Sequence, residues 1–307
     1  MPRMRERERE RGSFPTVTLL VAVPLCGMAI FFIWQWLNGG ITPEEAYVET
    51  KAAVLPSSPR SSRAAVGEAP TVPQERALPR VTRKKTGKGH RGDIVLIIDD
   101  LGFDGQPLER LMALDPNVNV AILPNGTRAS EFATRLHERG FEVLCHLPMQ
   151  PRGKETPGRN AILTSMSDEE IARATRENIE AVPHARGVNN HMGSLATSDR
   201  RVMTSVIGAM PDGMYFIDSR TGGGSVASDV ARELNVRTAA RHVFLDDAPN
   251  ERAVRRQLQE LADAAEKRGV AIGIGHPYPV TMRVLADELP GLRARGFRFV
   301  RASEIVR

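Results

Sequence analysis

Short apolar runs recur along the second half of the chain, and each of them ends at an acidic or histidine side chain. The clearest is the run Ile-Val-Leu-Ile-Ile at 94–98, which is followed by Asp99 and Asp100. Other runs end at His146, His191, Asp218, Asp246 and His276. Segments with helical periodicity separate the runs, and strands that alternate with helices are typical of a parallel sheet.

The same pattern predicts an α/β domain over residues 93–307. Strands are expected at 94–99, 118–123, 141–146, 186–190, 214–218, 243–246, 270–275 and 297–300. Helix boundaries lie between them, because Ser167 and Glu170 have the spacing of a capping box and Asn250 can cap a helix that ends at Gly269. We predict a distorted (β/α) barrel of about seven strands, with one unit missing or distorted. An open doubly wound sheet is the alternative.

An apolar segment at 14–37 is long enough to cross a bilayer. Trp34 and Trp36 stand at its far end, where interfacial aromatic residues are common. Arginines precede the segment and acidic residues follow it, so the positive-inside rule places residues 1–13 in the cytoplasm. We therefore expect a single-pass anchor in the inner (cytoplasmic) membrane, with the folded domain facing the periplasm or cell exterior. A cleaved signal peptide is the competing interpretation.

Residues 38–92 are rich in Pro, Ser, Ala, Arg and Lys and show no apolar period, which predicts a disordered linker. Its basic end at 84–88 is either solvated or in weak contact with anionic lipid or acidic envelope polymer. The formal net charge is +5, but aromatic residues do not interleave with basic clusters in the folded part. We therefore expect no binding of nucleic acid.

The carboxyl ends of parallel strands meet on one face, which is where barrels and open α/β sheets place their active sites. Asp100, His146 and His191 would offer one carboxylate and two imidazoles there. This donor set leaves positions open for water and substrate, and it suits a catalytic Zn²⁺ or a similar divalent metal. The alternative for each residue alone is structural: a helix cap for the aspartates and a satisfied polar side chain for a histidine.

Further candidates surround this set. Adjacent carboxylates such as Asp99 and Asp100 can divide their roles, one binding metal and the other accepting a proton. His276 is either a general acid or a structural residue at a turn. Asp218 could orient His276 or bind substrate, and Arg220 could hold an oxyanion or pair with Asp218.

Two more residues join the list of substrate-binding or supporting candidates. Asp246 either supports the site or caps a helix, and Asn190 can donate hydrogen bonds beside the proposed metal ligands. The glycine-rich stretch 222–225 lacks a phosphate-loop lysine and is expected to be a flexible substrate loop. The remaining histidines receive no role; they are His90, His137, His184 and His242.

Six short motifs carry a resemblance to a known family. They are Ile97-Ile98-Asp99-Asp100-Leu101-Gly102, Ala121-Ile122-Leu123-Pro124, His146-Leu147-Pro148-Met149, Asn190-His191-Met192-Gly193-Ser194, Phe216-Ile217-Asp218-Ser219-Arg220-Thr221 and Gly275-His276-Pro277. In order and spacing, they make residues 93–307 resemble the divergent polysaccharide deacetylases. That family is related to the broader polysaccharide deacetylases, so the resemblance implies a distorted (β/α) barrel with a metal held by Asp, His and His.

Carried onto this chain, the resemblance makes Asp99 the catalytic base, Asp100 a metal ligand and His276 the acid. The parent pattern takes both metal histidines from one His-x-x-x-His motif. Here His146 is the first, but Gln150 occupies the fifth position. We expect His191, from the next strand, to replace the missing ligand.

Together these features predict a membrane-anchored, metal-dependent hydrolase that acts on an acetylated envelope polysaccharide or a peptidoglycan-like glycan. The departure at Gln150 favours an alternative, a glycan-binding or scaffold protein that has lost turnover. A phosphoesterase or amidase is a third interpretation, because a ring of strand-end residues does not identify the bond that is cleaved.

Overall fold

The computed structural model describes residues 89–307. The predicted cytoplasmic segment 1–13, the anchor 14–37 and nearly all of the linker 38–92 lie outside these residues. Within 89–307 no helix has both the length and the apolar character that a membrane crossing requires.

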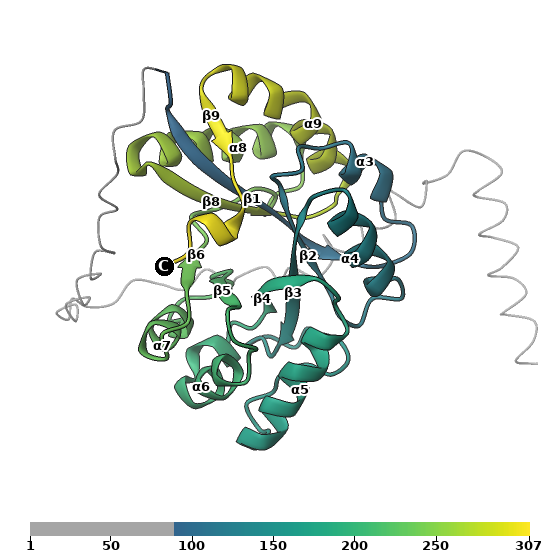
Figure 1. The fold of residues 1–307 in the computed structure, drawn as a ribbon, viewed down its shortest axis with the longest axis vertical. Helices are drawn as coiled ribbons and strands as arrows, with labels where there is room; N and C mark the ends of the chain where they lie inside the picture. The colour runs from purple at the N-terminus through teal and green to yellow at the C-terminus, as the bar shows by residue number, and fades with distance from the viewer. Residues whose placement is uncertain (1–88) are drawn as a thin grey trace, which may run out of the picture. The chain divides into compact units, whose positions relative to one another are not determined.

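Strands and helices alternate along this part of the chain (Figure 1). The strands are β1 (Gly92–Leu101), β2 (Asn119–Ile122), β3 (Glu142–Met149), β4 (Ala185–Met192), β5 (Tyr215–Asp218), β6 (Thr238–Ala240), β7 (Val243–Phe244), β8 (Val270–Gly275) and β9 (Phe297–Phe299). The α-helices are α3 (Leu108–Met112), α4 (Ala129–Glu138), α5 (Asp168–Glu180), α6 (Arg200–Gly208), α7 (Ala227–Glu233), α8 (Glu251–Arg268) and α9 (Pro279–Ala294). Two 3₁₀ turns, η1 (Ala196–Ser198) and η2 (Ala302–Glu304), complete the order.

The helix boundaries follow the expected capping chemistry. Ser167 accepts a hydrogen bond from the backbone of Glu170 at 3.2 Å, and the Glu170 carboxylate accepts one from the backbone of Ser167 at 2.8 Å, which confirms the capping box of α5. Asn250 caps α8 by accepting from the backbone of Ala253 at 2.9 Å. The same helix ends at Gly269, whose φ of 86° is the left-handed conformation that glycine adopts without steric cost.

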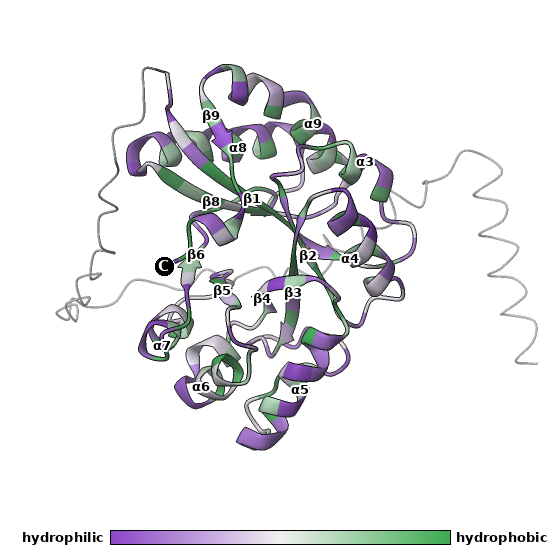
Figure 2. Cartoon of the chain, viewed as in Figure 1, coloured by the Kyte–Doolittle hydropathy of each residue, from purple (hydrophilic) through white to green (hydrophobic). Residues whose placement is uncertain are grey.

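All strands of the sheet run parallel, in the order β6-β5-β4-β3-β2-β1-β8-β7, with β9 added on β1. The two faces of the sheet are covered differently. On β1, Ile94, Leu96 and Ile98 face the cluster that includes the helices, whereas Val95 and Ile97 face a smaller cluster enclosed by the curled sheet. Figure 2 shows β1 and β8 as strongly hydrophobic, as strands buried on both faces are.

This arrangement supports the predicted distorted barrel rather than a doubly wound sheet, because the helices pack against one face only. The predicted missing unit lies between β6 and β7. These strands are consecutive and form the two edges of the sheet, yet only Arg241 and His242 connect them, and no helix intervenes. β6 was not among the expected strands, because Thr-Ala-Ala at 238–240 lacks the branched apolar side chains that mark a buried strand.

Arg241 and His242 join the two edges of the sheet without pairing β6 to β7. The backbone N–H of Arg241 donates to the carbonyl of Asp218 at 2.9 Å, on the β5 side. On the β8 side, His242 and Ile272 exchange hydrogen bonds, since His242 N–H donates to the Ile272 carbonyl at 2.9 Å and Ile272 N–H donates to His242 Nδ1 at 3.0 Å. We call this junction the seam of the barrel.

A polar cluster and the C-terminal residues close the amino end of the barrel. Tyr215 donates its hydroxyl to the buried carboxylate of Glu142 at 2.7 Å, and Ser303 donates to the same carboxylate through its backbone N–H at 2.8 Å and through its hydroxyl. Gly187 makes room for this cluster, because a Cβ there would lie 2.4 Å from the Tyr215 ring. Val300, Ala302 and Val306 then cover the inner apolar cluster.

We predict that Tyr215→Phe lowers the free energy of unfolding by about 1–3 kcal/mol, because a buried carboxylate loses a hydrogen-bond donor. Urea unfolding of the full-length chain measures this change. Thr204→Ala, which removes an exposed hydroxyl that donates to the Arg200 carbonyl, is the control and should change stability by less than about 0.5 kcal/mol. A similar change in both variants would contradict the proposed contribution of the buried bond.

Candidate functional site

The inner face of the sheet becomes polar at the carboxyl end of the barrel. Side chains alternate between the two faces of a strand, so a residue two positions after an inward-facing apolar residue also faces inward. Asp99 follows Ile97 in this way, His146 follows Leu144, and His276 follows Ile274, all three apolar residues belonging to the enclosed cluster. The predicted strand-end residues therefore share one face of the fold.

A β-bulge brings both aspartates to this face. Ile98 pairs with Val120 and Leu101 pairs with Ile122, so β1 contains one residue more than β2 between these pairs. Asp100 lies in this bulge, and its φ of 60° falls in the left-handed region. The bulge breaks the alternation of the strand, so that adjacent carboxylates can serve one site.

Three ligand atoms converge beside the bulge. Asp100 Oδ1 lies 2.8 Å from His191 Nδ1 and 3.2 Å from His146 Nε2, and the two ring nitrogens are 3.2 Å apart. Ligand atoms about 2.0–2.2 Å from a tetrahedral Zn²⁺ are roughly 3.3–3.6 Å from one another, which is close to this spacing. Within residues 89–307 these three residues form the one group of three or more His, Cys, Asp or Glu side chains whose ligand atoms all lie within 4.8 Å of one another.

The state of Asp100 also fits a cation. Its Oδ1 is buried and accepts no hydrogen bond from the described residues, although both imidazoles are near. Burial alone would raise the pKa of Asp100, but the imidazoles of His146 and His191 outweigh burial and hold this pKa well below its ordinary value. An ionised, buried carboxylate oxygen without a hydrogen-bond donor is a suitable metal ligand.

Asn189 links the candidate ligands to the candidate base. Its Oδ1 lies 2.9 Å from His146 Nδ1, and its Nδ2 donates to Asp99 Oδ1 at 2.8 Å. An amide oxygen only accepts hydrogen bonds, so His146 carries a proton on Nδ1, and its Nε2 is the ring nitrogen that faces Asp100. Asn189 was not among the expected site residues, although it lies two residues before His191 and therefore on the same face of β4.

Asn190, which was selected, faces the other way. It accepts a hydrogen bond from the backbone of Ser219 at 2.9 Å and donates to the carbonyl of Met192 at 2.7 Å. Its side chain therefore holds the ends of β4 and β5 in place rather than facing the metal ligands.

Asp99 is buried and lies beside the triad. Its Oδ2 is 3.6 Å from His146 Nε2. Burial raises the pKa of Asp99, and the nearby His146 and His276 only partly oppose this effect. A carboxylate with a raised pKa, hydrogen-bonded at one oxygen and oriented by Asn189, has the properties of a general base.

His276 is oriented by Asp246, not by Asp218. His276 Nδ1 lies 2.9 Å from Asp246 Oδ1, and the backbone N–H of His276 donates to Asp246 Oδ2 at 2.7 Å. Burial lowers the pKa of His276, but Asp246 and Asp100 outweigh burial and raise it to about 9. Nε2 of His276 lies 3.7 Å from Asp100 Oδ2, so a protonated ring nitrogen borders the proposed metal site.

Asp218 occupies an outward-facing position on β5, because the preceding Ile217 faces the enclosed cluster. Its carboxylate accepts hydrogen bonds from the backbone of Arg220 at 2.9 Å and from the Ser225 hydroxyl at 2.8 Å. It thereby anchors the loop after β5. Arg220 has a φ of 48°, and its exposed guanidinium belongs to none of the ion pairs within 89–307, so the considered side-chain pair with Asp218 does not form.

Gln150 is turned away from the triad. Its Oε1 accepts hydrogen bonds from the backbone and hydroxyl of Thr164 at 2.8 and 2.9 Å. The fifth position of the parent motif thus supports a loop, while His191 supplies the second imidazole from β4, where Pro148 of β3 is its pairing partner.

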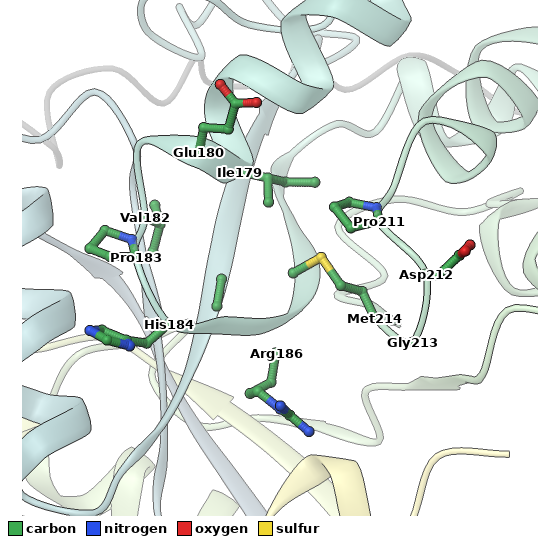
Figure 3. A pocket seen from close by; sticks show the side chains of 11 residues that line it. Ile179, Glu180, Val182, Pro183, His184, Arg186, Pro211, Asp212, Gly213 and Met214 are labelled. Carbon is green, nitrogen blue, oxygen red and sulfur yellow. The ribbon is translucent and has the colours of Figure 1, made fainter.

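The other described histidines stand apart from this site. The rings of His137 and His184 stack at 4.1 Å, and His242 belongs to the seam. A hollow beside His184 is shown in Figure 3, with Pro183, Arg186 and Met214 among its lining residues. It lies where β4 and β5 begin, at the opposite end of the strands from the triad, and contains no candidate catalytic residue.

Comparisons with known proteins identify relatives of this chain. An Escherichia coli protein named only as the uncharacterised YibQ is 40% identical over 195 residues, which is 63% of this chain and 61% of the relative. This chain therefore matches less than two thirds of that relative's length. An uncharacterised Haemophilus influenzae protein is 36% identical over 200 residues, covering 65% of this chain and 71% of the relative.

A crystal structure of an uncharacterised Agrobacterium tumefaciens protein shares the fold, with a TM-score of 0.68 at 18% identity. The match covers 72% of this chain and 92% of that one. The model of the family described as divergent polysaccharide deacetylase matches residues 96–306, which include all of the candidate site. This match confirms the resemblance, and the chain belongs to the divergent polysaccharide deacetylase family.

Proposed function

We propose that this protein is a metal-dependent hydrolase that removes acetyl groups from a glycan of the cell envelope. The observation that carries the proposal is the convergence of Asp100, His146 and His191 beside the buried carboxylate of Asp99 and the imidazole of His276. Family membership supports a glycan as the substrate. The metal ligands, the catalytic roles and the choice of Zn²⁺ are parts of this proposal.

Asp100, His146 and His191 would hold the metal ion. When bound, a divalent cation lowers the pKa of coordinated water and polarises the acetyl carbonyl. Asp99 accepts the proton of the attacking water, and Asn189 holds Asp99 and His146 in the orientation that this transfer needs. His276 donates a proton from Nε2 to the leaving nitrogen or oxygen of the sugar, so that the C–N or C–O bond breaks and acetate is formed.

A second candidate is a glycan-binding or scaffold protein without turnover. The presence of Gln150 favours it, because the parent motif has its second histidine at this position. Glycan binding that Asp99→Asn leaves unchanged, together with a wild-type protein that releases no acetate from any acetylated glycan, would support this candidate over the hydrolase.

We also propose that the protein is anchored in the inner membrane through residues 14–37 and that its folded domain faces the periplasm or cell exterior. The length of the apolar segment and the arginines before it support this proposal. Protease treatment of intact and permeabilised spheroplasts tests it. Digestion of the domain only after the membrane is permeabilised would contradict an outward orientation.

We predict that Asp99→Asn lowers the rate of acetate release by about 10²- to 10⁴-fold, because the general base is lost. Metal stoichiometry should remain that of the wild type, since Asp99 is not a proposed ligand. Acetate release and bound metal are measured on the same preparations. Asp212→Asn, a change of an exposed aspartate beside the distant hollow, is the matched control and should keep full activity.

Loss of an imidazole at the triad should abolish tight metal binding. We expect His191→Ala to weaken Zn²⁺ affinity by at least about 100-fold in calorimetry, because one of three ligands is removed. His137→Ala removes an exposed imidazole from α4, and Gln150→Ala removes the parent motif's fifth position; both should bind Zn²⁺ as the wild type does. Weaker binding in Gln150→Ala but not in His191→Ala would reverse the ligand assignment.

The hydrogen bond that His276 donates to Asp246 predicts a pH dependence. The pKa of His276 is about 9, above the ordinary value of about 6.5. Protonation of His276 therefore stabilises the fold fully below pH of about 6.5, and this contribution is lost as the pH rises through about 9. In metal-free protein, Asp246→Asn should lower the His276 pKa measured by NMR and reduce this loss, whereas Asp218→Asn should leave the pKa unchanged.

A further inference from the structure

A polar groove of about 580 Å³ lies at the seam of the barrel. It is lined by the loop after β5, by the segment that joins β6 and β7, and by the first turns of α8. The residues that matter for its chemistry are Arg220, Arg241, Phe244, Asp247, Arg256 and Glu260. We refer to it as the seam groove.

The groove exists because the unit between β6 and β7 is reduced to Arg241 and His242. In a complete (β/α) barrel a helix would follow β6 and cover this position. Its absence leaves one side of α8 facing the loop after β5. Arg256 projects from this side of α8, and Arg220 projects from the loop.

The seam groove adjoins the candidate active site. The ring of Phe244, which lines the groove, lies 5.3 Å from the ring of His276. Arg220 directly follows Ser219, whose hydroxyl is 3.3 Å from Asn189 Nδ2. A sugar chain with one residue at the metal ligands can therefore place a neighbouring residue in the groove.

Arg241 is a fixed part of the wall. It donates from Nε to the Ser219 carbonyl at 2.6 Å and from a terminal nitrogen to the Arg220 carbonyl at 2.8 Å. Its guanidinium also lies 4.8 Å from the centre of the Phe244 ring. These contacts hold the backbone of Arg220 in its left-handed conformation, so that the Arg220 side chain projects outward.

The charges of the groove favour an anion. Arg220 and Arg256 are exposed and belong to none of the ion pairs within residues 89–307. The carboxylates in the groove, Asp247 and Glu260, are exposed and also outside those ion pairs. Three arginines against two carboxylates leave a positive balance, and guanidinium groups bind carboxylates through paired hydrogen bonds.

We propose that the seam groove binds a carboxylate on a sugar adjacent to the acetylated one, so that the preferred substrate is an anionic glycan. Arg220 and Arg256 contact the carboxylate, and Phe244 packs against the sugar ring. This inference rests on the proposed deacetylase function for its biological meaning. The binding preference itself is measured without turnover.

The test compares two forms of one ligand. The first is a soluble oligosaccharide that alternates N-acetylglucosamine with N-acetylmuramic acid, whose lactyl group bears a carboxylate. The second is the same oligosaccharide with each carboxylate converted to its methyl amide. Calorimetry on the full-length chain carrying Asp99→Asn gives both Kd values, and we expect the acid form to bind roughly fivefold tighter or more at low salt.

Substitutions then assign the preference to the groove. Arg256→Gln and Arg220→Gln should each reduce the ratio of the two Kd values, and the double variant should bring it to about one. Arg176→Gln changes an exposed arginine on α5, outside the groove, and should retain the wild-type ratio. Arg256→Gln changes a residue within a helix, so this variant tests the proposal even if Arg220→Gln alters the conformation of the loop.

The outcomes separate this inference from the proposed function. Equal Kd values for the two forms, binding of neither form, or an unchanged ratio in the double variant would overturn the carboxylate site. Acetate release by the wild type is assayed in parallel on the acid form of this oligosaccharide and on a neutral N-acetylglucosamine oligomer. If acetate is released but the two forms bind equally well, only the carboxylate site in the groove is refuted. If the acid form binds more tightly through the two arginines but no acetate is released, the carboxylate site is supported and only the hydrolase is refuted.

Discussion

The extra residue in β1 is the constraint on which the site depends. In a regular strand Asp99 and Asp100 would point to opposite faces of the sheet. The bulge places Asp100 in the left-handed region and returns its carboxylate to the inner face, beside His146 and His191. A left-handed conformation in a residue other than glycine costs about 1–3 kcal/mol, and interactions in the surrounding fold must offset this cost. The Asp100 carbonyl accepts a hydrogen bond from Gln106 at 2.6 Å, which helps to hold the loop that follows.

A second constraint is that the two imidazoles of the candidate metal site come from neighbouring strands. In the parent motif two imidazoles come from one segment, four residues apart. In this chain they come from β3 and β4, whose pairing places Pro148 opposite His191. The register of two parallel strands therefore replaces local spacing as the determinant of ligand geometry. Asn189 strengthens this link, because it contacts both His146 and Asp99 from β4.

The sequence predicted those features that depend on local chemistry or on a shared position along the strands. The caps at Ser167 and Asn250 are local, and the structure has them. Asp100, His146 and His191 were expected on one face because each of them follows the apolar run of a parallel strand. The shared position could be predicted because a strand buried on both faces is a continuous apolar run, and its end is marked by the first polar residues.

Features that depend on tertiary context were harder to predict. Asn189 and Asn190 are identical residue types on opposite faces of β4, and the sequence alone does not say which face points toward the site. Asp246 rather than Asp218 contacts His276 because β7 pairs with β8, a neighbour relation that the sequence does not state. The short strand β6 and the seam carry few apolar residues, and backbone hydrogen bonds to β5 and β8 hold them in place.

The C-terminal segment has a consequence for how the domain folds. Residues 300–306 complete the enclosed cluster, and Ser303 contacts Glu142, which lies 161 positions earlier in the chain. Ala302 likewise donates to Asn119 across 183 positions. Contacts of such long range are formed slowly, because the loop between the partners must first be ordered. Residues 300–306 therefore close the amino end of the barrel only when strands that are distant in the sequence have already assembled.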